Sequence, residues 1–279
     1  MRLRSLLFVP GDRPERFAKA AASGADAIIL DLEDSVSSER KSFARQAVVE
    51  YLAEPGPMSS ARRFVRINPV DSPQLKLDLA VARAADGLVL PKAEGTETFA
   101  ALDRAAESFS LPPILPIVTE TPAAVFRMAD YARLGRRLLG LTWGAEDLPA
   151  AIGAAGSRHA DGRFTSPYEL VRSLTLFAAH AAKVEAIETV FPDIRDLEGL
   201  GRYAERGAFD GFTGMMAIHP AQIQAINAAF SPSERSLEQA RRIVAAFGAA
   251  PGQGAIQFEG RMIDAPHLKS ARRILGDFS

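Results

Sequence analysis

The sequence predicts an α/β protein: a (β/α)₈ TIM barrel followed by a small, lid-like C-terminal extension. Eight short apolar runs alternate with helical patterns over about 220 residues, as in this barrel. Several runs, such as 27–30 and 87–90, are continuously apolar, which is typical of strands buried on both faces of a parallel sheet. An open doubly wound sheet is the alternative. The first run ends in Val9-Pro10-Gly11-Asp12 and lacks a GxGxxG dinucleotide-binding turn, which favours the barrel.

In chain order, the predicted strands are 6–10, 27–31, 64–68, 87–91, 114–118, 138–143, 186–191 and 212–219. Apolar residues recur at helical spacing in the segments between them, which predicts helices at 15–22, 38–52, 75–84, 96–106 and 167–182. We therefore expect a TIM-barrel catalytic domain over residues 1–248.

The C-terminal part of the chain differs in pattern. A helical stretch at 234–247 leads into a Gly/Pro-rich linker at 248–254. Beyond it we expect short strands at 255–258 and 261–263, a turn at Glu259-Gly260, and a helix over 266–275. Residues 249–279 therefore read as a small appendage, with a terminal helix that packs on the barrel as the alternative.

Composition narrows the range of partners. The 33 Lys and Arg residues nearly balance the 34 Asp and Glu residues, for a net charge of −1. Nucleic acids and anionic membranes require a concentrated positive field, so neither is expected as a partner. Cysteine is absent, which excludes thiolate nucleophiles and Cys-ligated metals. No apolar run approaches the ~18 residues of a membrane span, and the start does not fit a secretory signal, so we expect a cytoplasmic protein.

Charged residues gather at the predicted carboxyl ends of the strands, where barrel enzymes build their active sites. Charged groups in such a mouth need mutual pairing or a ligand. Mutual pairing is the expectation for four of these residues, Asp31, Glu33, Asp34 and Lys92. The residues at these ends are Asp31, Glu33, Asp34, Arg66, Asn68, Lys92, Glu120, Thr121, Glu146, Asp147, Asp193 and His219.

Glu120 and Asp147 follow the fifth and sixth strands, which are neighbours in a barrel. Two carboxylates that converge there repel each other unless a cation lies between them. Mg²⁺ suits a site with one or two carboxylates, because water and a chelating substrate complete its octahedron. In the alternative arrangement, one carboxylate pairs with Arg66 and the other caps a helix.

Cations follow two other strands. Arg66 ends the third strand and can fork onto a substrate carboxylate or an oxyanion, or pair with a carboxylate of the mouth. Arg13 and Lys19 flank a tight turn before a helix, which suits a phosphate group. Solvated cations around a Pro-initiated helix are the plainer interpretation of that segment.

Seven short motifs together resemble the citrate lyase β-subunit/malyl-CoA lyase family, in that family's order and over nearly the whole chain. They are Phe8-Val-Pro-Gly, Asp31-Leu-Glu-Asp34, Arg66-Ile-Asn68, Pro91-Lys92, Glu120-Thr, Gly144-Ala-Glu-Asp147-Leu and Ile218-His-Pro220. The resemblance implies a (β/α)₈ barrel and Mg²⁺. It also implies cleavage or formation of a carbon–carbon bond between an acyl-CoA and a 2-oxo acid, with malyl-, methylmalyl- or citramalyl-CoA as the hydroxyacyl thioester.

The resemblance also assigns residues within the barrel. Glu120 and Asp147 match the metal ligands, and Glu120 therefore also lies in the substrate-binding set. Arg66 matches the arginine that grips the oxo acid, where it also serves catalysis by facing the developing enolate charge. The positions that contact CoA correspond to Phe8, Arg13 and Lys19.

The tail, Gly254-Ala-Ile-Gln-Phe-Glu-Gly260-Arg-Met-Ile-Asp264-Ala-Pro266, resembles the family as well. Asp264 matches an aspartate that is catalytic in members acting on free CoA esters, where it reaches a neighbouring subunit's active site. The resemblance therefore implies a homo-oligomer, namely a trimer. From the residues alone, Asp264 is a good N-cap before Pro266.

One departure from the family concerns Met215, because the family often has lysine at this position. The absence of this lysine is expected to remove a cation from the rim of the mouth.

Three other activities stay open. The first is thioester hydrolysis of malyl-CoA after condensation, as in a malate synthase-like enzyme. The others are a β subunit of a citrate lyase complex acting on citryl-acyl carrier protein, and a metal-dependent aldolase of free pyruvate.

Overall fold

The computed structural model describes residues 3–54, 61–107 and 110–276, which form two compact units, Met1–Phe230 and Ser231–Ser279. The second unit begins earlier than the boundary at residue 248 that the sequence suggested. The reason is that α10 (Glu234–Gly248) packs against α11 (Ala265–Leu275) and so belongs with the C-terminal unit. The Gly/Pro-rich segment therefore lies inside that unit.

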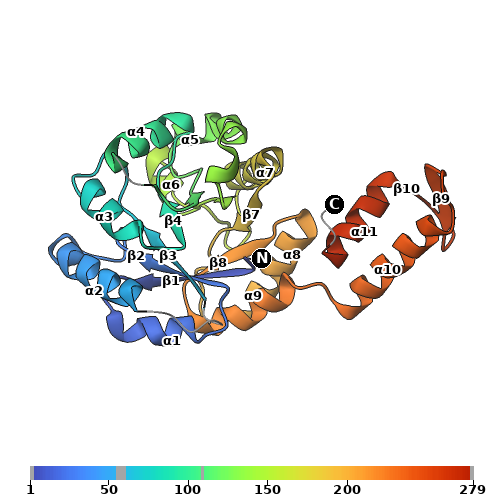
Figure 1. The fold of residues 1–279 in the computed structure, drawn as a ribbon, viewed down its shortest axis with the longest axis horizontal. Helices are drawn as coiled ribbons and strands as arrows, with labels where there is room; N and C mark the ends of the chain where they lie inside the picture. The colour runs from blue at the N-terminus through green and yellow to red at the C-terminus, as the bar shows by residue number, and fades with distance from the viewer. Residues whose placement is uncertain (1–2, 55–60, 108–109, 277–279) are drawn as a thin grey trace. The chain divides into compact units, whose positions relative to one another are not determined.

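The first unit contains eight parallel strands, which Figure 1 shows surrounded by helices. Their order in the sheet is β5-β4-β3-β2-β1-β8-β7-β6. A parallel bridge between Ile117 and Thr142, and a 2.9 Å hydrogen bond from the Val118 N–H to the Thr142 carbonyl, join the two end strands. The sheet therefore closes, and the predicted (β/α)₈ barrel is confirmed. The strands are β1 (Ser5–Pro10), β2 (Ala27–Asp31), β3 (Arg62–Arg66), β4 (Gly87–Leu90), β5 (Ile114–Pro116), β6 (Gly140–Thr142), β7 (Glu185–Glu188) and β8 (Gly214–Ala217).

Helices follow the strands in the βα order of this fold. The α-helices of the first unit are α1 (Phe17–Ala21), α2 (Lys41–Ala53), α3 (Leu75–Ala82), α4 (Thr96–Ala106), α5 (Pro122–Phe126), α6 (Asp147–Ile152), α7 (Ser166–Ala182), α8 (Leu197–Asp210) and α9 (Ile223–Ala229). Short 3₁₀ turns extend several of them: η1 (Pro14–Arg16), η2 (Ser38–Arg40), η3 (Met128–Arg133), η4 (Gly135–Arg137) and η5 (Pro220–Gln222).

Two apolar cores explain why the strand segments are continuously apolar. Leu6 and Ile29 pack in the core inside the barrel, whereas the adjacent Leu7 and Leu30 pack in the core between the strands and the helices. Successive strand residues point to opposite faces, so a strand with both faces covered needs apolar residues at every position. Among the described residues, no helix is long and apolar enough to cross a lipid bilayer.

The second unit is a helix, a hairpin and a second helix. β9 (Ala255–Phe258) pairs antiparallel with β10 (Arg261–Asp264), and α11 begins directly after β10. Glu259 and Gly260 connect the strands with φ values of 50° and 78°. A two-residue turn with both φ values positive matches the twist of a hairpin, which explains glycine at its second position. The predicted strand–turn–strand–helix order is confirmed.

Candidate active site

Arg66, the last residue of β3, lies at the centre of a charged cluster at the carboxyl ends of the strands. Its Nε and Nη2 each lie 2.7 Å from a carboxylate oxygen of Asp31, the last residue of β2. Its Nη1 lies 2.9 Å from Glu33 Oε2. The Phe8 ring lies below the guanidinium, with its centroid 4.9 Å from Cζ. The pairing expected among these mouth residues is therefore present, and it fixes the orientation of Arg66.

The electrostatic environment keeps this cluster charged. Burial disfavours the charge of Arg66, but hydrogen bonds to Asp31 and the charges of Asp31 and Glu33 outweigh it and raise the Arg66 pKa. Burial likewise opposes ionisation of Asp31, yet the hydrogen bonds and charge of Arg66 bring the pKa of Asp31 below its usual range. Arg66 is thus a permanent cation at the mouth of the barrel.

Lys92 connects this cluster to the two candidate metal ligands. Its Nζ lies 2.8 Å from Glu33 Oε1 and 3.6 Å from Asp147 Oδ1. Its backbone N–H donates a hydrogen bond to the Glu120 carboxylate. Lys92 has φ = 49°, a left-handed conformation that is costly for a residue with a Cβ and is found most often at functional sites. The turn after β4 therefore directs one backbone donor and one ammonium into the mouth.

Glu120 lies in the loop between β5 and α5 and is 4% exposed. Burial, together with the nearby charges of Glu33 and Asp147, raises the pKa of Glu120 to about 8, although the Lys92 N–H opposes the shift. A Cβ at Gly144 would lie 3.1 Å from Glu120 Cγ, so the absence of a side chain there gives the glutamate its room. Glu120 is thus a buried carboxyl group whose ionised form is disfavoured, even with Lys92 nearby.

Asp147 is the first residue of α6, and its side chain is 37% exposed. The arrangement in which one carboxylate pairs with Arg66 and the other is a helix cap does not form, because Arg66 pairs with Asp31 and Glu33 and the cap of α6 is Glu146. Among the described residues, no group of three or more Asp, Glu or His side chains forms a metal cage. Two carboxylates with the remaining positions open fit Mg²⁺, which keeps water and substrate ligands.

The segment after β1 carries the cations proposed to meet CoA. Arg13 and Lys19 are both exposed, Arg13 at the start of η1 and Lys19 in α1. Arg13 Nε lies 3.8 Å from Asp12 Oδ1, and Arg40 Nε lies 2.6 Å from Asp12 Oδ2. Arg40 therefore joins this basic rim, although no local sequence pattern connects it with Arg13.

Two residues predicted at the strand ends serve local turns instead. Asp193 accepts a hydrogen bond from the Arg195 N–H, and it is exposed. His219 caps η5 by accepting a hydrogen bond from the Ala221 N–H at 3.2 Å. Neither is paired with the charged cluster around Arg66 among the contacts of the described residues.

Met215 does not lie at the rim, contrary to the expectation that its identity changes the charge there. It is the second residue of β8, it is fully buried, and it packs in the core between strands and helices. Its register partner on β7 is Glu188, whose carboxylate is already neutralised by Arg172 Nε at 2.7 Å. A methionine therefore fits this position without leaving a buried charge unpaired.

Asp264 lies in the C-terminal unit, as the last residue of β10 and the N-cap of α11. His267 Nδ1 is 2.6 Å from Asp264 Oδ1, and the two side chains are 54% and 46% exposed, respectively. His267 was not among the site residues predicted from the sequence. A histidine three residues after an N-cap aspartate was the available signal, because residues i and i+3 of a first helical turn are neighbours.

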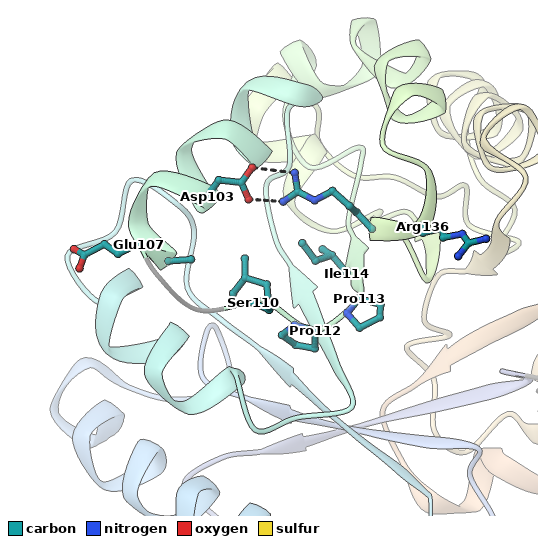
Figure 2. Close-up of a pocket in the computed structure, with 10 residues that line it drawn as sticks. Asp103, Glu107, Ser110, Pro112, Pro113, Ile114 and Arg136 are labelled. Atoms are coloured by element: carbon teal, nitrogen blue, oxygen red, sulfur yellow. Dashed lines mark hydrogen bonds and ion pairs between the residues drawn. The ribbon is translucent and has the colours of Figure 1, made fainter.

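One pocket of the barrel unit lies at the opposite ends of the strands. It has a volume of about 470 Å³ and lies where β5 begins, close to α4 and η4. Figure 2 shows Asp103 paired with the neighbouring arginine, and Arg136 directed away from that pair. None of the predicted site residues lines this pocket.

The sequence pattern of the HpcH/HpaI aldolase/citrate lyase family matches residues 4–220. The chain is 40% identical to a citrate lyase subunit beta-like protein of Mycobacterium tuberculosis, over 96% of this chain and 93% of that protein. In Cereibacter sphaeroides, a (3S)-malyl-CoA thioesterase is 36% identical and an L-malyl-CoA/beta-methylmalyl-CoA lyase is 31% identical, each over 98% of this chain and 93% of the relative.

A solved structure shows the same fold over the whole length. The crystal structure of CitE from Mycobacterium tuberculosis, in complex with magnesium, acetoacetate and coenzyme A, superposes with a TM-score of 0.84. It is 37% identical and covers 99% of this chain and 98% of its own. The expected enzyme class, a carbon–carbon lyase, is confirmed at the level of the family. The chain belongs to the HpcH/HpaI aldolase/citrate lyase family.

Proposed function

We propose that the chain is a Mg²⁺-dependent carbon–carbon lyase that cleaves a 3-hydroxyacyl-CoA thioester into an acyl-CoA and a 2-oxo acid, or catalyses the reverse condensation. The supporting observation is that Lys92 contacts both carboxylates, Glu120 through its backbone N–H and Asp147 through its ammonium. The same ammonium contacts Glu33, which pairs with the fixed cation Arg66. The CitE structure with magnesium, acetoacetate and coenzyme A supports the same ligand classes. Malyl-, methylmalyl- and citramalyl-CoA are the candidate substrates.

Glu120 and Asp147 would hold the magnesium ion. Bound there, it would supply positive charge to the hydroxyl and carboxylate oxygens of the substrate. The elevated pKa of Glu120 supports this role: burial and the nearby carboxylates outweigh the charge of Lys92, so a bound cation would favour the ionised form. Gly144 leaves the space in which the Glu120 side chain lies.

Arg66 would stabilise the negative charge of the substrate. Asp31 and Glu33 fix its guanidinium, so no reorganisation is needed when charge develops on the departing thioester enolate or on the oxo acid. Phe8 supports the flat face of this guanidinium. The exposed cations Arg13 and Lys19 would bind the phosphates of CoA by charge.

Asp264 would transfer the proton to or from the α-carbon of the acyl-CoA. In the cleavage direction the substrate hydroxyl would give its proton to solvent, the carbon–carbon bond would break, and the electron pair of that bond would pass to the α-carbon of the acyl-CoA. That carbon must then gain a proton, and in the condensation direction a carboxylate must remove it. We assign this proton transfer to Asp264. In a homotrimer, this residue would come from the C-terminal unit of a neighbouring subunit, within residues 249–279.

A coupled assay tests the proposal. The purified protein is incubated with Mg²⁺ and either malyl-CoA or citramalyl-CoA, while 2-oxo acid and free thiol are measured in parallel. Formation of oxo acid without thiol is the expected result. No turnover of either ester by a folded, CoA-binding protein would contradict it and would direct the search to a carrier-protein thioester.

Thioester hydrolysis is the second candidate, and one observation favours it: the relative named (3S)-malyl-CoA thioesterase is 36% identical to this chain. The same two carboxylates and the same aspartate would then activate water rather than a carbon acid. Release of thiol from malyl-CoA without oxo acid in the assay above would establish this alternative.

A further inference from the structure

We propose that His267 is a positioning residue for proton transfer: it orients the Asp264 carboxylate by a hydrogen bond from its Nδ1–H. This inference rests on the proposed function, because it concerns the aspartate assigned to the α-carbon proton. The observation that carries it is the 2.6 Å distance between His267 Nδ1 and Asp264 Oδ1.

The distances around Nδ1 decide where its proton lies. The Asp264 backbone nitrogen lies 3.3 Å from Nδ1, a contact that needs an unprotonated ring nitrogen to accept it. The carboxylate oxygen lies much closer, at 2.6 Å, and without a proton between them the two lone pairs would repel each other. The shorter contact therefore places the proton on Nδ1, and His267 donates to Asp264.

The backbone of Asp264 is held in place by the elements on either side of it, so the hydrogen bond from His267 acts on the side chain. Asp264 pairs with Ala255 across the β9–β10 hairpin, and α11 with Pro266 follows at once, so the backbone of Asp264 is held from both sides. The Asp264 side chain accepts a hydrogen bond from the His267 backbone N–H, and the His267 ring is the second group that sets its torsions. A base must lie within hydrogen-bond reach of the proton it removes, so a group that fixes those torsions controls the reaction.

Helix capping is the competing explanation. A residue at the third helical position can accept a hydrogen bond from the N-cap N–H, and glutamate is the usual residue there. Capping needs an acceptor at position 267, whereas positioning needs a donor. The two roles are therefore separable: His267→Glu keeps the acceptor and lacks the donor, His267→Gln keeps both, and His267→Leu lacks both.

The experiment measures exchange of the α-protons of acetyl-CoA with solvent deuterium, in the presence of Mg²⁺ and oxalate as a non-condensing oxo-acid analogue. We expect His267→Glu to fold with a melting temperature near that of the natural chain and to lose on the order of 100-fold in exchange rate. The KM for acetyl-CoA should change little. His267→Gln should keep its exchange rate within a few-fold.

The outcomes separate this inference from the proposed function. Full exchange by His267→Glu, together with loss of exchange by Asp264→Asn, would overturn the role of His267 and leave that of Asp264 intact. Full exchange by Asp264→Asn, or no exchange by the natural chain, would overturn the proposed base and this inference with it. If His267→Leu loses only thermal stability, the residue acts through capping alone.

Discussion

At the scale of single residues, the mouth of the barrel divides its carboxylates into two kinds. Asp31 and Glu33 contact Arg66 directly, so their charges are compensated within the protein. Glu120 receives a backbone N–H from Lys92 but lies near two further carboxylates, and its pKa is raised to about 8. This difference indicates that Glu120 is the carboxylate whose ionised form a bound Mg²⁺ would favour most.

Glu120→Gln should lower lyase activity by at least about 100-fold, because it removes a ligand charge while keeping the shape of the side chain. The magnesium-induced rise in melting temperature should disappear with it. Glu94→Gln is the matched control, since Glu94 accepts a hydrogen bond from Thr121, the residue next to Glu120. Magnesium-dependent turnover by Glu120→Gln at the natural rate would contradict the assignment.

The pKa of Glu120 also predicts how magnesium binding depends on pH. A folded-state pKa of about 8, above the ordinary value of 4.5, means that this group's contribution to stability is present at low pH and is lost as pH rises towards 8. Magnesium must displace the proton, so its affinity should rise over the same interval.

Titration calorimetry in buffers of different ionisation enthalpy measures this proton. Magnesium binding should release about one proton below about pH 7 and none above about pH 9. Glu120→Gln should give no magnesium-binding heat in the same titration, because it lacks this ligand. An unchanged heat across buffers at pH 6.5 in the natural chain would rule out a protonated Glu120 as the ligand.

At the scale of elements, buried polar groups behind the barrel wall fix the position of its helices. Arg172 of α7 is 3% exposed and contacts Glu188 of β7 at 2.7 Å and Asp210 of α8 at 2.7 Å. Trp143, which follows β6, also donates to Glu188. One arginine thereby connects two helices to a strand, and its partner Glu188 is the register neighbour of Met215 on β8.

Arg172→Met should lower the free energy of unfolding by about 3–5 kcal/mol, because it leaves the charge of Glu188 buried and uncompensated. Arg206→Met is the control: its pair with Glu169 is about one-third to one-half exposed, and such pairs contribute about 0–1 kcal/mol. Urea denaturation followed by circular dichroism measures both. Equal losses in the two variants would show that burial does not determine how much the Arg172–Glu188 pair contributes to the free energy of unfolding.

At the scale of the whole molecule, the proposed activity needs residues from both compact units. Glu120 and Asp147 lie in Met1–Phe230, and Asp264 lies in Ser231–Ser279. The assignment of Asp264 to a neighbouring subunit makes each active site a joint product of two chains, and a mixture of variants can test that directly.

Glu120→Gln and Asp264→Asn, each inactive alone, should recover activity when they are unfolded, mixed in equal amounts and refolded together. In a closed ring of subunits with random mixing, roughly one quarter of the sites would combine an intact Glu120 with an intact Asp264 from the next chain. If each chain supplied both residues to its own site, no intact site would form. An inactive mixture that assembles normally would contradict a shared site.

Local patterns sufficed to predict most elements of the fold. The predicted helix at 96–106 coincides with α4, and the predicted strands overlap all eight strands of the barrel. The turn at Glu259-Gly260 was equally visible, since glycine satisfies its positive φ. These features depend on periodicity and turn chemistry, which are properties of short segments.

Other predictions depended on which segments pack together. The unit boundary moved from residue 248 to residue 230, because the pairing of α10 with α11 leaves no trace in a linear pattern. Met215 was expected at the rim but lies in the core between strands and helices, because it is the second residue of β8 and not a residue at its carboxyl end. Arg40 and His267 became visible only through their contacts with Asp12 and Asp264.

The sequence by itself determined the barrel, the order of its strands and helices, and the family to which its motifs belong, because these follow from periodicity and from residue identity. The tertiary structure decided which charges compensate one another. Arg66 is satisfied by Asp31 and Glu33, whereas Glu120 is left buried beside Lys92 with its pKa raised. Burial and distance between strands set those interactions, and neither quantity is encoded in any single segment of the chain.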